Sequence, residues 1–354
     1  MKLTLGNLFN SSAIIKAVID RSMVTHQDEI FWKKKLDFEE TKSRTFKTFV
    51  GTVMGVTPGT IIDRNANKPL RERKTLGSGY GEVANLGDRY QLDNDRLDML
   101  KELVDRFNKS KTSEQQASLS AIIDYIVDDM RQVRLAPHKR MDLVVGSLVS
   151  TGEGFVESKT KEGELTLDID LPVNKVTPNS EERKNLLTYL RGLVTSLKPT
   201  MGAIVAMEMR QSTFNKHILA SDELKNTYTA KFGQDELLMS GGLMTLDMAN
   251  ALFKGLGLPR IIINDDMVAN DTGGSDYCFA DDKISLLPSE KLGKMMWHTP
   301  YEVSDPIPNK EYTILEGGQF ISALRTDEGR FLEYGCEWVP NLTNPNKITI
   351  IDLA

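Results

Sequence analysis

The strongest constraint on the fold is a long helical pattern in residues 119–149. Apolar side chains recur at helical spacing along its first half: they are Leu119, Ile122, Ile123, Ile126, Met130 and Val133. Pro137 predicts a kink or a restart, after which the pattern continues from 141 to 149 and stops at Gly152. About 30 helical residues make a helix of roughly 45 Å. A single helix of that length in a chain of mixed structure predicts a spine along the molecule.

Length and composition describe an ordinary soluble chain with room for two or three substructures. Of its 354 residues, 40% are hydrophobic and 27% are charged, and the net charge is −6. This charge argues against a bulk nucleic-acid binder and leaves room for local basic patches. The only cysteines, Cys278 and Cys336, give no disulfide framework, which fits a reducing compartment. The first residues, MKLTLGNLFNSS, lack the apolar core of a signal peptide, and no apolar run is long enough for a membrane span.

The stretch LGSGYGEV (76–83) comes close to the glycine loop that covers ATP in protein kinases. The other kinase elements are missing, because no V-A-I-K lysine, no H-R-D catalytic loop and no D-F-G follow. A Walker P-loop is missing as well, since Gly293-Lys294 is followed by Met295. These glycines therefore indicate a hairpin or loop that needs backbone freedom.

Other catalytic and metal-binding patterns are also lacking. The four histidines are scattered, without H-E-x-x-H or C-x-x-C spacing, so a zinc site is not expected. Cys278 and His298 could pair as nucleophile and base, but a buried structural cysteine is the favoured interpretation. Residues 264–282 hold six aspartates that do not match a calcium loop. Solvated turns are favoured there, and a weak cation site stays open. The sequence therefore predicts no enzyme and no cofactor.

The remaining segments follow in a definite order. Residues 1–40 resemble an arm with one short helix at 13–21. Residues 46–95 suggest two long strands of a hairpin that lacks its own core. The later expectations are helix 96–107, linker 108–116, hairpin 153–175, helix 181–198 capped by Asn179 or Ser180, strand 203–209, helix 245–254, strand 260–263 and β-structure from 301 onward.

Five stretches in this order resemble the major capsid proteins of tailed bacteriophages. They are RMDLVVGSLVSTG (140–152), GELTLDIDLP (163–172), TLDMANALFKGLGLPRIIIND (245–265), FADDKISLLPSEKLGKMMWHTPYE (279–302) and WVPNLTNPNKITIIDL (338–353). The resemblance is to the Hong Kong 97-type fold, and most closely to the lambda-type major capsid protein E family. None of the five stretches is catalytic.

The resemblance implies an α+β fold with named parts. Residues 1–40 would be the N-arm and 41–95 the E-loop, an extended hairpin. Residues 96–177, with the spine helix and a hairpin, and the strands of 301–354 would form the P-domain. Residues 178–300 would form an α/β A-domain.

The same resemblance implies a function and partners. Many copies would form pentamers and hexamers of an icosahedral shell that encloses double-stranded DNA, bound without sequence specificity. Scaffolding, portal and head-decoration proteins would be further partners, and the protein would lie in the virion after assembly in the host cytoplasm. The alternative is an encapsulin-type cellular nanocompartment shell that packages a cargo enzyme. The founding member's isopeptide cross-link has no matching residues here, so non-covalent assembly is expected.

The E-loop carries a cluster of positive charge, which the resemblance places at a contact between subunits. Its members are Arg64, Lys68, Arg71, Arg73 and Lys74. Acidic partners on the neighbour's spine helix would be Asp124, Asp128 and Asp129. A solvated loop tip is the other interpretation of the same charges. Because residues 1–95 show no core of their own, they are expected to become ordered only against neighbouring subunits.

Overall fold

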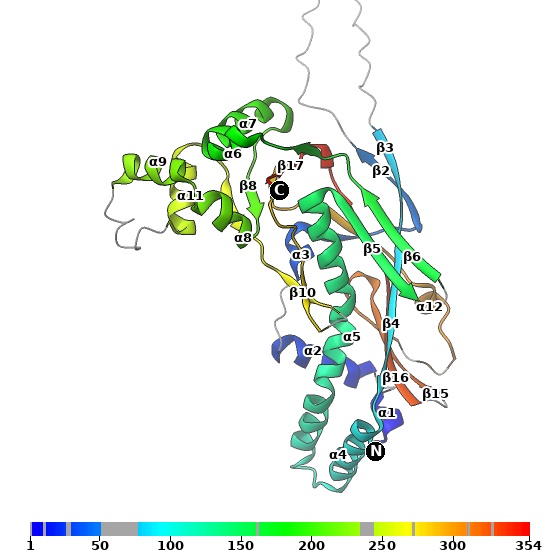
Figure 1. Ribbon diagram of the computed structural model, residues 1–354. Helices are drawn as coiled ribbons and strands as arrows, with labels where there is room; N and C mark the ends of the chain where they lie inside the picture. Colours follow the sequence, from blue (N-terminus) through cyan, green and yellow to red (C-terminus); the bar gives the residue numbers. More distant parts are fainter. Residues whose placement is uncertain are drawn as a thin grey trace, which may run out of the picture.

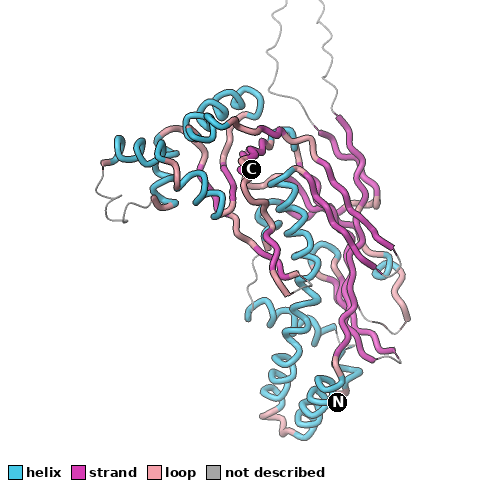
Figure 2. The backbone as a smooth tube through the Cα atoms, in the orientation of Figure 1, coloured by secondary structure: helices cyan, strands magenta, loops and turns pink. Residues whose placement is uncertain are grey.

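A single long helix runs through the molecule, with the longest strands along one side of it and helical groups at both ends (Figures 1 and 2). The computed structural model describes residues 2–9, 12–25, 30–50, 77–160, 163–233, 244–270, 273–308, 310, 312–326 and 329–354. None of the helices in these ranges is both long enough and apolar enough to cross a membrane.

The spine helix α5 spans Gln115–Thr151, which is 37 residues and roughly 55 Å. It continues through Pro137 without ending, so the helix does not restart there, and a kink at this proline stays a prediction. Proline has no N–H to donate to the carbonyl of Val133 four residues earlier. The buried side-chain amide of Gln319 replaces that donor: its Nε2 lies 3.3 Å from the oxygen of Val133 and 3.1 Å from that of Arg134. The helix ends at Gly152, which has a left-handed φ of 81°.

The outer half of α5 belongs to a helical core. Helices α4 (Asn94–Lys109) and α2 (Ser12–Thr25) pack against it, and α1 (Leu5–Phe9) packs against α2 and α4. Apolar side chains of all four helices form one buried cluster with strands of the larger sheet, and it includes Phe9, Val18, Val104, Ile122 and Met130.

The larger sheet has six strands and is centred on a long strand, β16 (Gly329–Leu342). One edge of β16 pairs with β13 (Gly293–His298) and β15 (Phe320–Thr326), and the other pairs with β4 (Ala84–Leu92). Strand β14 (Tyr312–Ile314) follows β15, and β1 (Leu36–Glu40) runs parallel to β13. The side of β16 that carries Cys336 and Trp338 joins the inner half of α5 in a second core.

The smaller sheet has five strands in the order β7-β17-β12-β8-β9. Their bounds are β7 (Asn174–Val176), β17 (Thr349–Asp352), β12 (Lys283–Leu287), β8 (Ala206–Met209) and β9 (Arg260–Ile263). Around it lie α6 (Ser180–Lys184), α7 (Leu186–Met201), α8 (Gln211–Thr213), the π-helix η1 (Phe214–Leu219), α9 (Asp222–Phe232) and α11 (Leu246–Gly255). Their apolar faces form a third core.

Short elements complete the fold. Three two-stranded antiparallel pairs lie outside the main sheets: β2 (Thr45–Val50) with β3 (Gly77–Glu82), β5 (Glu153–Thr160) with β6 (Gly163–Asp170), and β10 (Met267–Ala269) with β11 (Ser275–Tyr277). The other elements are α3 (Phe31–Lys35), α12 (Tyr301–Ser304), η2 (Glu316–Gly318) and η3 (Pro345–Lys347). The glycines of LGSGYGEV thus lie in or beside a hairpin strand, as the sequence indicates.

Most locally coded elements agree with expectation. The strand at Arg260–Ile263 has the predicted bounds, and Asn179 caps α6 through a capping box with Glu182. The sheets, however, cross the expected domain limits. Strand β13 lies within residues 178–300 but joins the larger sheet, and β17 lies within 301–354 but joins the smaller one.

Residues 1–95 were expected to lack a core of their own and to be ordered by neighbouring subunits, but the described part of residues 1–40 packs into cores of its own chain. This segment holds three helices and a strand, where one helix was predicted. Leu8, Ile15 and Val18 are buried in the helical core, and Phe31 and Trp32 are buried in the core under the larger sheet. Their contact surfaces come from distant parts of the chain, which sequence periodicity cannot indicate.

The role of Gln319 predicts a coupling with Pro137. Replacing Gln319 by Leu leaves a buried carbonyl without a donor, so the free energy of unfolding should fall by about 1–3 kcal/mol. In a Pro137→Ala background the restored N–H serves Val133, so the same replacement should cost clearly less. Urea unfolding of the wild type, both single variants and the double variant measures this coupling. Equal losses in both backgrounds would show that Gln319 does not serve the helix.

Candidate functional site

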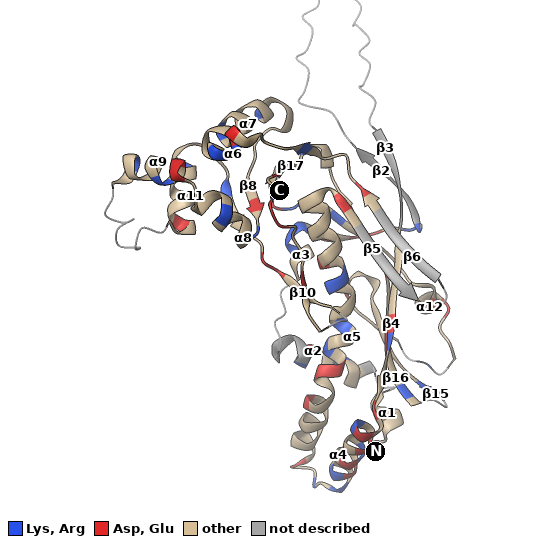
Figure 3. Cartoon of the chain, viewed as in Figure 1, with Lys and Arg blue, Asp and Glu red and all other residues tan. Residues whose placement is uncertain are grey.

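Only some of the residues proposed from the sequence as an intersubunit contact lie within the described residues. Arg64, Lys68, Arg71, Arg73 and Lys74 lie outside the described residues. Their proposed acidic partners lie on the outer half of α5. Figure 3 shows acidic and basic residues interspersed along α4 and along this part of α5.

Asp124 and Asp129 already contact cations of their own chain. Asp124 lies 3.2 Å from Nε of Arg21 on α2, and Asp129 lies 2.8 Å from an Nη nitrogen of Arg96 on α4. Asp128 is exposed between them. Burial raises the pKa of Asp129, Arg96 opposes the shift and Asp128 adds to it. These carboxylates therefore help to hold α2 and α4 on the spine helix within one subunit.

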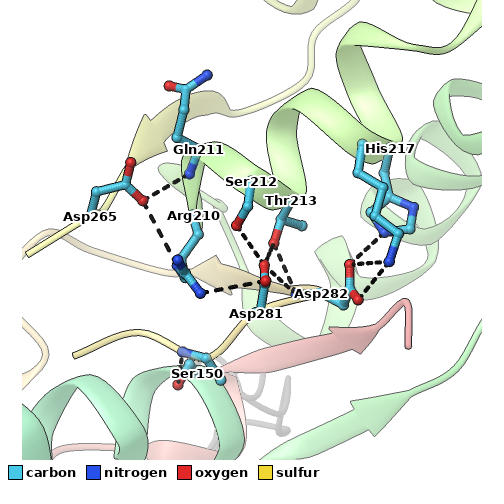
Figure 4. Close-up of polar contacts among 11 residues, drawn as sticks. Ser150, Arg210, Gln211, Ser212, Thr213, His217, Asp265, Asp281 and Asp282 are labelled. Carbon is cyan, nitrogen blue, oxygen red and sulfur yellow. Dashed lines mark hydrogen bonds and ion pairs between the residues drawn. The ribbon is translucent and has the colours of Figure 1, made fainter. Parts of the chain in front are cut away.

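The aspartate-rich segment 264–282 folds back on the start of α8 (Figure 4). Asp281 accepts hydrogen bonds from Ser212 at 2.6 Å and Thr213 at 3.1 Å, and Arg210 lies 3.4 Å away. The hydrogen bond from Ser212 is the main cause that holds the pKa of Asp281 below its usual range. Asp265 accepts from the backbone N–H of Gln211 at 3.0 Å. The network therefore anchors the turn after β8 to two loops of this segment.

Asp282 is satisfied in the same way by the π-helix. Nζ of Lys216 lies 2.7 Å and Nε2 of His217 lies 2.8 Å from its carboxylate. The hydrogen bond from Lys216 is the largest factor lowering the pKa of Asp282. Four aspartates of this segment thus have cationic partners within the chain: Asp265 and Asp281 pair with Arg210, Asp266 with Lys34 and Asp282 with Lys216. Within the described ranges, no group of three or more His, Cys, Asp or Glu side chains is placed to hold one.

A strap of residues 30–44, formed by α3, β1 and the turn after them, carries the polar contacts that sequence reasoning missed. Trp32, which is fully buried, donates its backbone N–H to Oδ1 of Asp142 at 2.9 Å. Its indole N–H points to Nδ1 of His138 at 3.3 Å. Both acceptors belong to α5, so the strap is fastened to the inner half of the spine helix.

Further along, the strap reaches the smaller sheet through a buried ion pair. Nζ of Lys35 lies 2.6 Å from Oε2 of Glu208 on β8, and the two side chains are only 7% and 2% exposed. Nδ2 of Asn264 donates to Oε1 of the same carboxylate at 3.1 Å. The three lysines of FWKKK suggest a solvated face from sequence alone, so the burial of Lys35 gives no local signal.

The strap ends on the larger sheet at a second buried carboxylate. Arg44 forms an ion pair with Glu337 on β16, and Nδ1 of His298 lies 2.8 Å from the same side chain. His298 is therefore engaged by a glutamate. Cys278 is buried, and burial is the main cause that raises the pKa of its thiol to about 12. Neither residue of the suggested Cys278–His298 pair is arranged as a nucleophile or its base.

Similarity to known proteins is found in structure alone. No protein-family model and no curated protein sequence matches the chain. The putative capsid protein of an Escherichia coli CFT073 prophage superposes with a TM-score of 0.53, over 97% of this chain and 99% of that chain, at 10% identity. A phage-related protein of Bordetella bronchiseptica RB50 gives 0.45 at 11% identity, with 95% and 96% covered. The cyanophage A-1(L) capsid gives 0.45 at 11% identity, with 92% of each chain covered.

The chain has a phage capsid fold. The match to the prophage protein extends over nearly all of both chains, so the fold accounts for the spine helix, both sheets and the helical groups together. This confirms the α+β capsid fold that the five sequence stretches predict. At 10% identity the similarity concerns the fold, and the division into arm, loop and domains stays a prediction.

The buried ion pair of the strap should contribute more to the free energy of unfolding than the half-exposed ion pair of the spine helix. Glu208→Ala would leave Lys35 buried without its partner, and the free energy of unfolding should fall by about 3–5 kcal/mol. Asp124→Ala removes a half-exposed pair and should cost less than about 1 kcal/mol. Urea unfolding of the two variants measures the difference, with Asp124→Ala as the matched control. Losses of equal size would mean that the strap contact is no stronger than a surface pair.

Proposed function

We propose that the chain is a major capsid protein whose copies assemble into the icosahedral shell of a tailed phage. The observation that carries this proposal is the match over 97% of the chain to a prophage capsid protein. The role is structural, and the buried, protonated thiol of Cys278 and the engaged His298 agree with it. The shell would consist of pentamers and hexamers around double-stranded DNA.

The parts named from the sequence enter the proposal with it. Residues 41–95 act as the E-loop, and residues 178–300 as the A-domain that lines the capsomer axes. The pairing of β2 with β3 supports an extended hairpin at the E-loop. Portal, scaffolding and head-decoration proteins are the further partners, and DNA is held by few, sequence-independent contacts. The finished shell would place the protein in the virion, after assembly in the host cytoplasm.

The E-loop cations remain the proposed intersubunit contact, and the structure adds further acidic residues that could be their partners. Asp124 and Asp129 are paired within their own subunit, so an incoming arginine would have to share or displace those cations. Exposed carboxylates along α4 supply further acceptors near the same surface: Asp95, Asp98, Glu102 and Asp105. Arginine suits such sites because its planar fork can bind a carboxylate through two hydrogen bonds.

Expression of the chain alone tests the main proposal. Closed shells or five- and six-fold capsomers should be visible by negative-stain electron microscopy. Shells isolated from phage-producing cells should contain nuclease-protected double-stranded DNA. Shells that instead enclose one host enzyme would identify a cellular nanocompartment, and a purified chain that stays monomeric under all assembly conditions would contradict both.

The E-loop charge makes a separate prediction. Changing Arg71 and Arg73 together to Glu should leave the subunit folded, yet weaken or block assembly, because the mutated loop would repel the carboxylates it is proposed to meet. Raised salt should imitate the variant in part. Circular dichroism checks the fold and sedimentation measures the shells. A double Arg→Lys variant, which keeps the charge, is the matched control. Normal shell yield from the Glu variant would assign these arginines to a solvated loop tip.

A further inference from the structure

The hairpin formed by β2 and β3 has weak means of holding its own direction. Its register places a glycine of β3 opposite Phe46, Thr48 and Val50, so every second pair of residues contains a glycine. Glycine offers no side chain for a cross-strand contact, and it weakens the interior of a strand. The direction in which this hairpin leaves the body therefore depends on the contacts at its base.

The base of the hairpin consists of Arg44, which leads into β2, and Val83, which follows β3. The first pair of the hairpin is Thr45 with Glu82. Directly beyond it, the backbone N–H of Val83 donates to the carbonyl oxygen of Arg44 at 2.9 Å. The two strands are therefore joined at the point where they reach the body, and whatever holds this point orients both of them.

The side chain of Arg44 attaches the base to the larger sheet. Its Nε lies 3.1 Å from Oε2 of Glu337, and an Nη nitrogen of the same guanidinium bonds to Oε1. Glu337 is 2% exposed and lies on β16, the strand on which the sheet is centred, and Nδ1 of His298 on β13 lies 2.8 Å from its Oε2. A planar guanidinium that binds a carboxylate at two points is restricted in rotation as well as in distance.

The side chain of Val83 attaches the other strand of the hairpin to the same sheet. It is buried in a small apolar cluster with Met296 on β13 and Val339 on β16, and Ile169 of β6 packs against this cluster. The hairpin thus has a polar anchor below one strand and an apolar anchor below the other, and both anchors use β13 and β16. Apolar contact is not directional, whereas the two hydrogen bonds of Arg44 are.

We propose that Arg44 is a positioning residue: its two-point contact with Glu337, the hairpin clamp, fixes the direction in which β2 and β3 leave the larger sheet and so presents the hairpin to a second copy of the chain. The step from the direction of the hairpin to a second copy rests on the proposed shell function. A hairpin that is already oriented loses less conformational freedom when it binds, so the clamp lowers the free-energy cost of association.

Amide hydrogen exchange in the full-length, unassembled chain tests the clamp. In Arg44→Gln, the N–H of Val83 and the first pairs of the hairpin should exchange about tenfold faster than in the wild type, because hydrogen bonds between charged groups at the base are lost. Arg44→Lys keeps the charge but not the planar fork, so its exchange rate should lie between those of the wild type and Arg44→Gln.

Arg89→Gln is the matched control. Arg89 also pairs with a glutamate of β16, Glu333, and both arginine side chains are 53% exposed. Each glutamate keeps another partner in its variant, so the two variants should lose similar free energies of unfolding in urea. Only Arg44→Gln should speed exchange in the hairpin. Unchanged exchange at Val83 in Arg44→Gln, or an equal rise in Arg89→Gln, would overturn the clamp.

Sedimentation of assembled shells tests the second step. Arg44→Gln should yield clearly fewer shells than Arg89→Gln at the same protein concentration, and Arg44→Lys should recover part of the loss. Equal shell yields from Arg44→Gln and Arg89→Gln would overturn the role of the hairpin's direction in assembly. A wild-type chain that forms no shells would contradict the proposed function instead, and the exchange measurement would still decide whether Arg44 orients the hairpin.

Discussion

The spine helix α5 is the element on which the rest of the structure depends, because its two halves belong to two different cores. Ile122, Ile126 and Met130 pack with the N-terminal helices and α4, whereas Val144 and Leu148 pack under the larger sheet. Pro137 lies between these halves. Because Gln319 supplies a donor for the carbonyls that the proline leaves free, one continuous helix can carry both cores. A rigid helix fixes the distance and rotation between them, which two shorter helices with a joint would not.

The strap adds a second constraint, because it joins α5 to both sheets. Apolar burial of Phe31, Trp32 and Leu36 supplies most of its affinity for the body. The polar contacts of the strap mainly determine the position at which it binds to the body. A shift of the strap by one residue would leave Glu208 buried without Lys35, and an unpaired buried charge is far more costly than the pair is favourable. The buried carboxylates therefore select one register of a segment that hydrophobic contact alone would hold less specifically.

The sequence predicts the features that depend on near neighbours. The spacing of the apolar residues predicts α5, Asn179 is one of the two expected caps and does start α6, and Arg260–Ile263 agrees with its predicted strand residue for residue. Pairings between distant segments are another matter. The β-branched and aromatic pattern of β16 does not encode that β4 lies on its far edge, about 250 residues earlier in the chain.

Prediction of the candidate site met the same limit. Asp124 and Asp129 are visible in the sequence as acidic residues on a helix, but their partners Arg21 and Arg96 are set by how α2 and α4 pack. Lys35 and Asp142 look like surface residues in the sequence, because charged groups are rarely buried. Only the folded chain places Asp142 beneath Trp32 and Lys35 against Glu208. The five basic residues from Arg64 to Lys74 belong to a segment outside the described residues, so their contacts stay a prediction.

The distribution of buried residues also bears on how copies of such a chain could associate. Among the described residues, three large buried clusters lie within one subunit, and the N-terminal helices contribute to two of them, so this part of the chain packs against itself. The pair β2–β3, like the pairs β5–β6 and β10–β11, is only a two-stranded sheet, which alone is marginal in water. In a shell of identical copies, the free energy of association would then be spent on ordering this hairpin against a neighbour. If the body is packed within one subunit and only the hairpin is ordered by a neighbour, each contact between subunits can be weak and reversible. Closure of the whole shell, in which every subunit makes the same set of contacts, supplies the cooperativity that a single pair of subunits lacks.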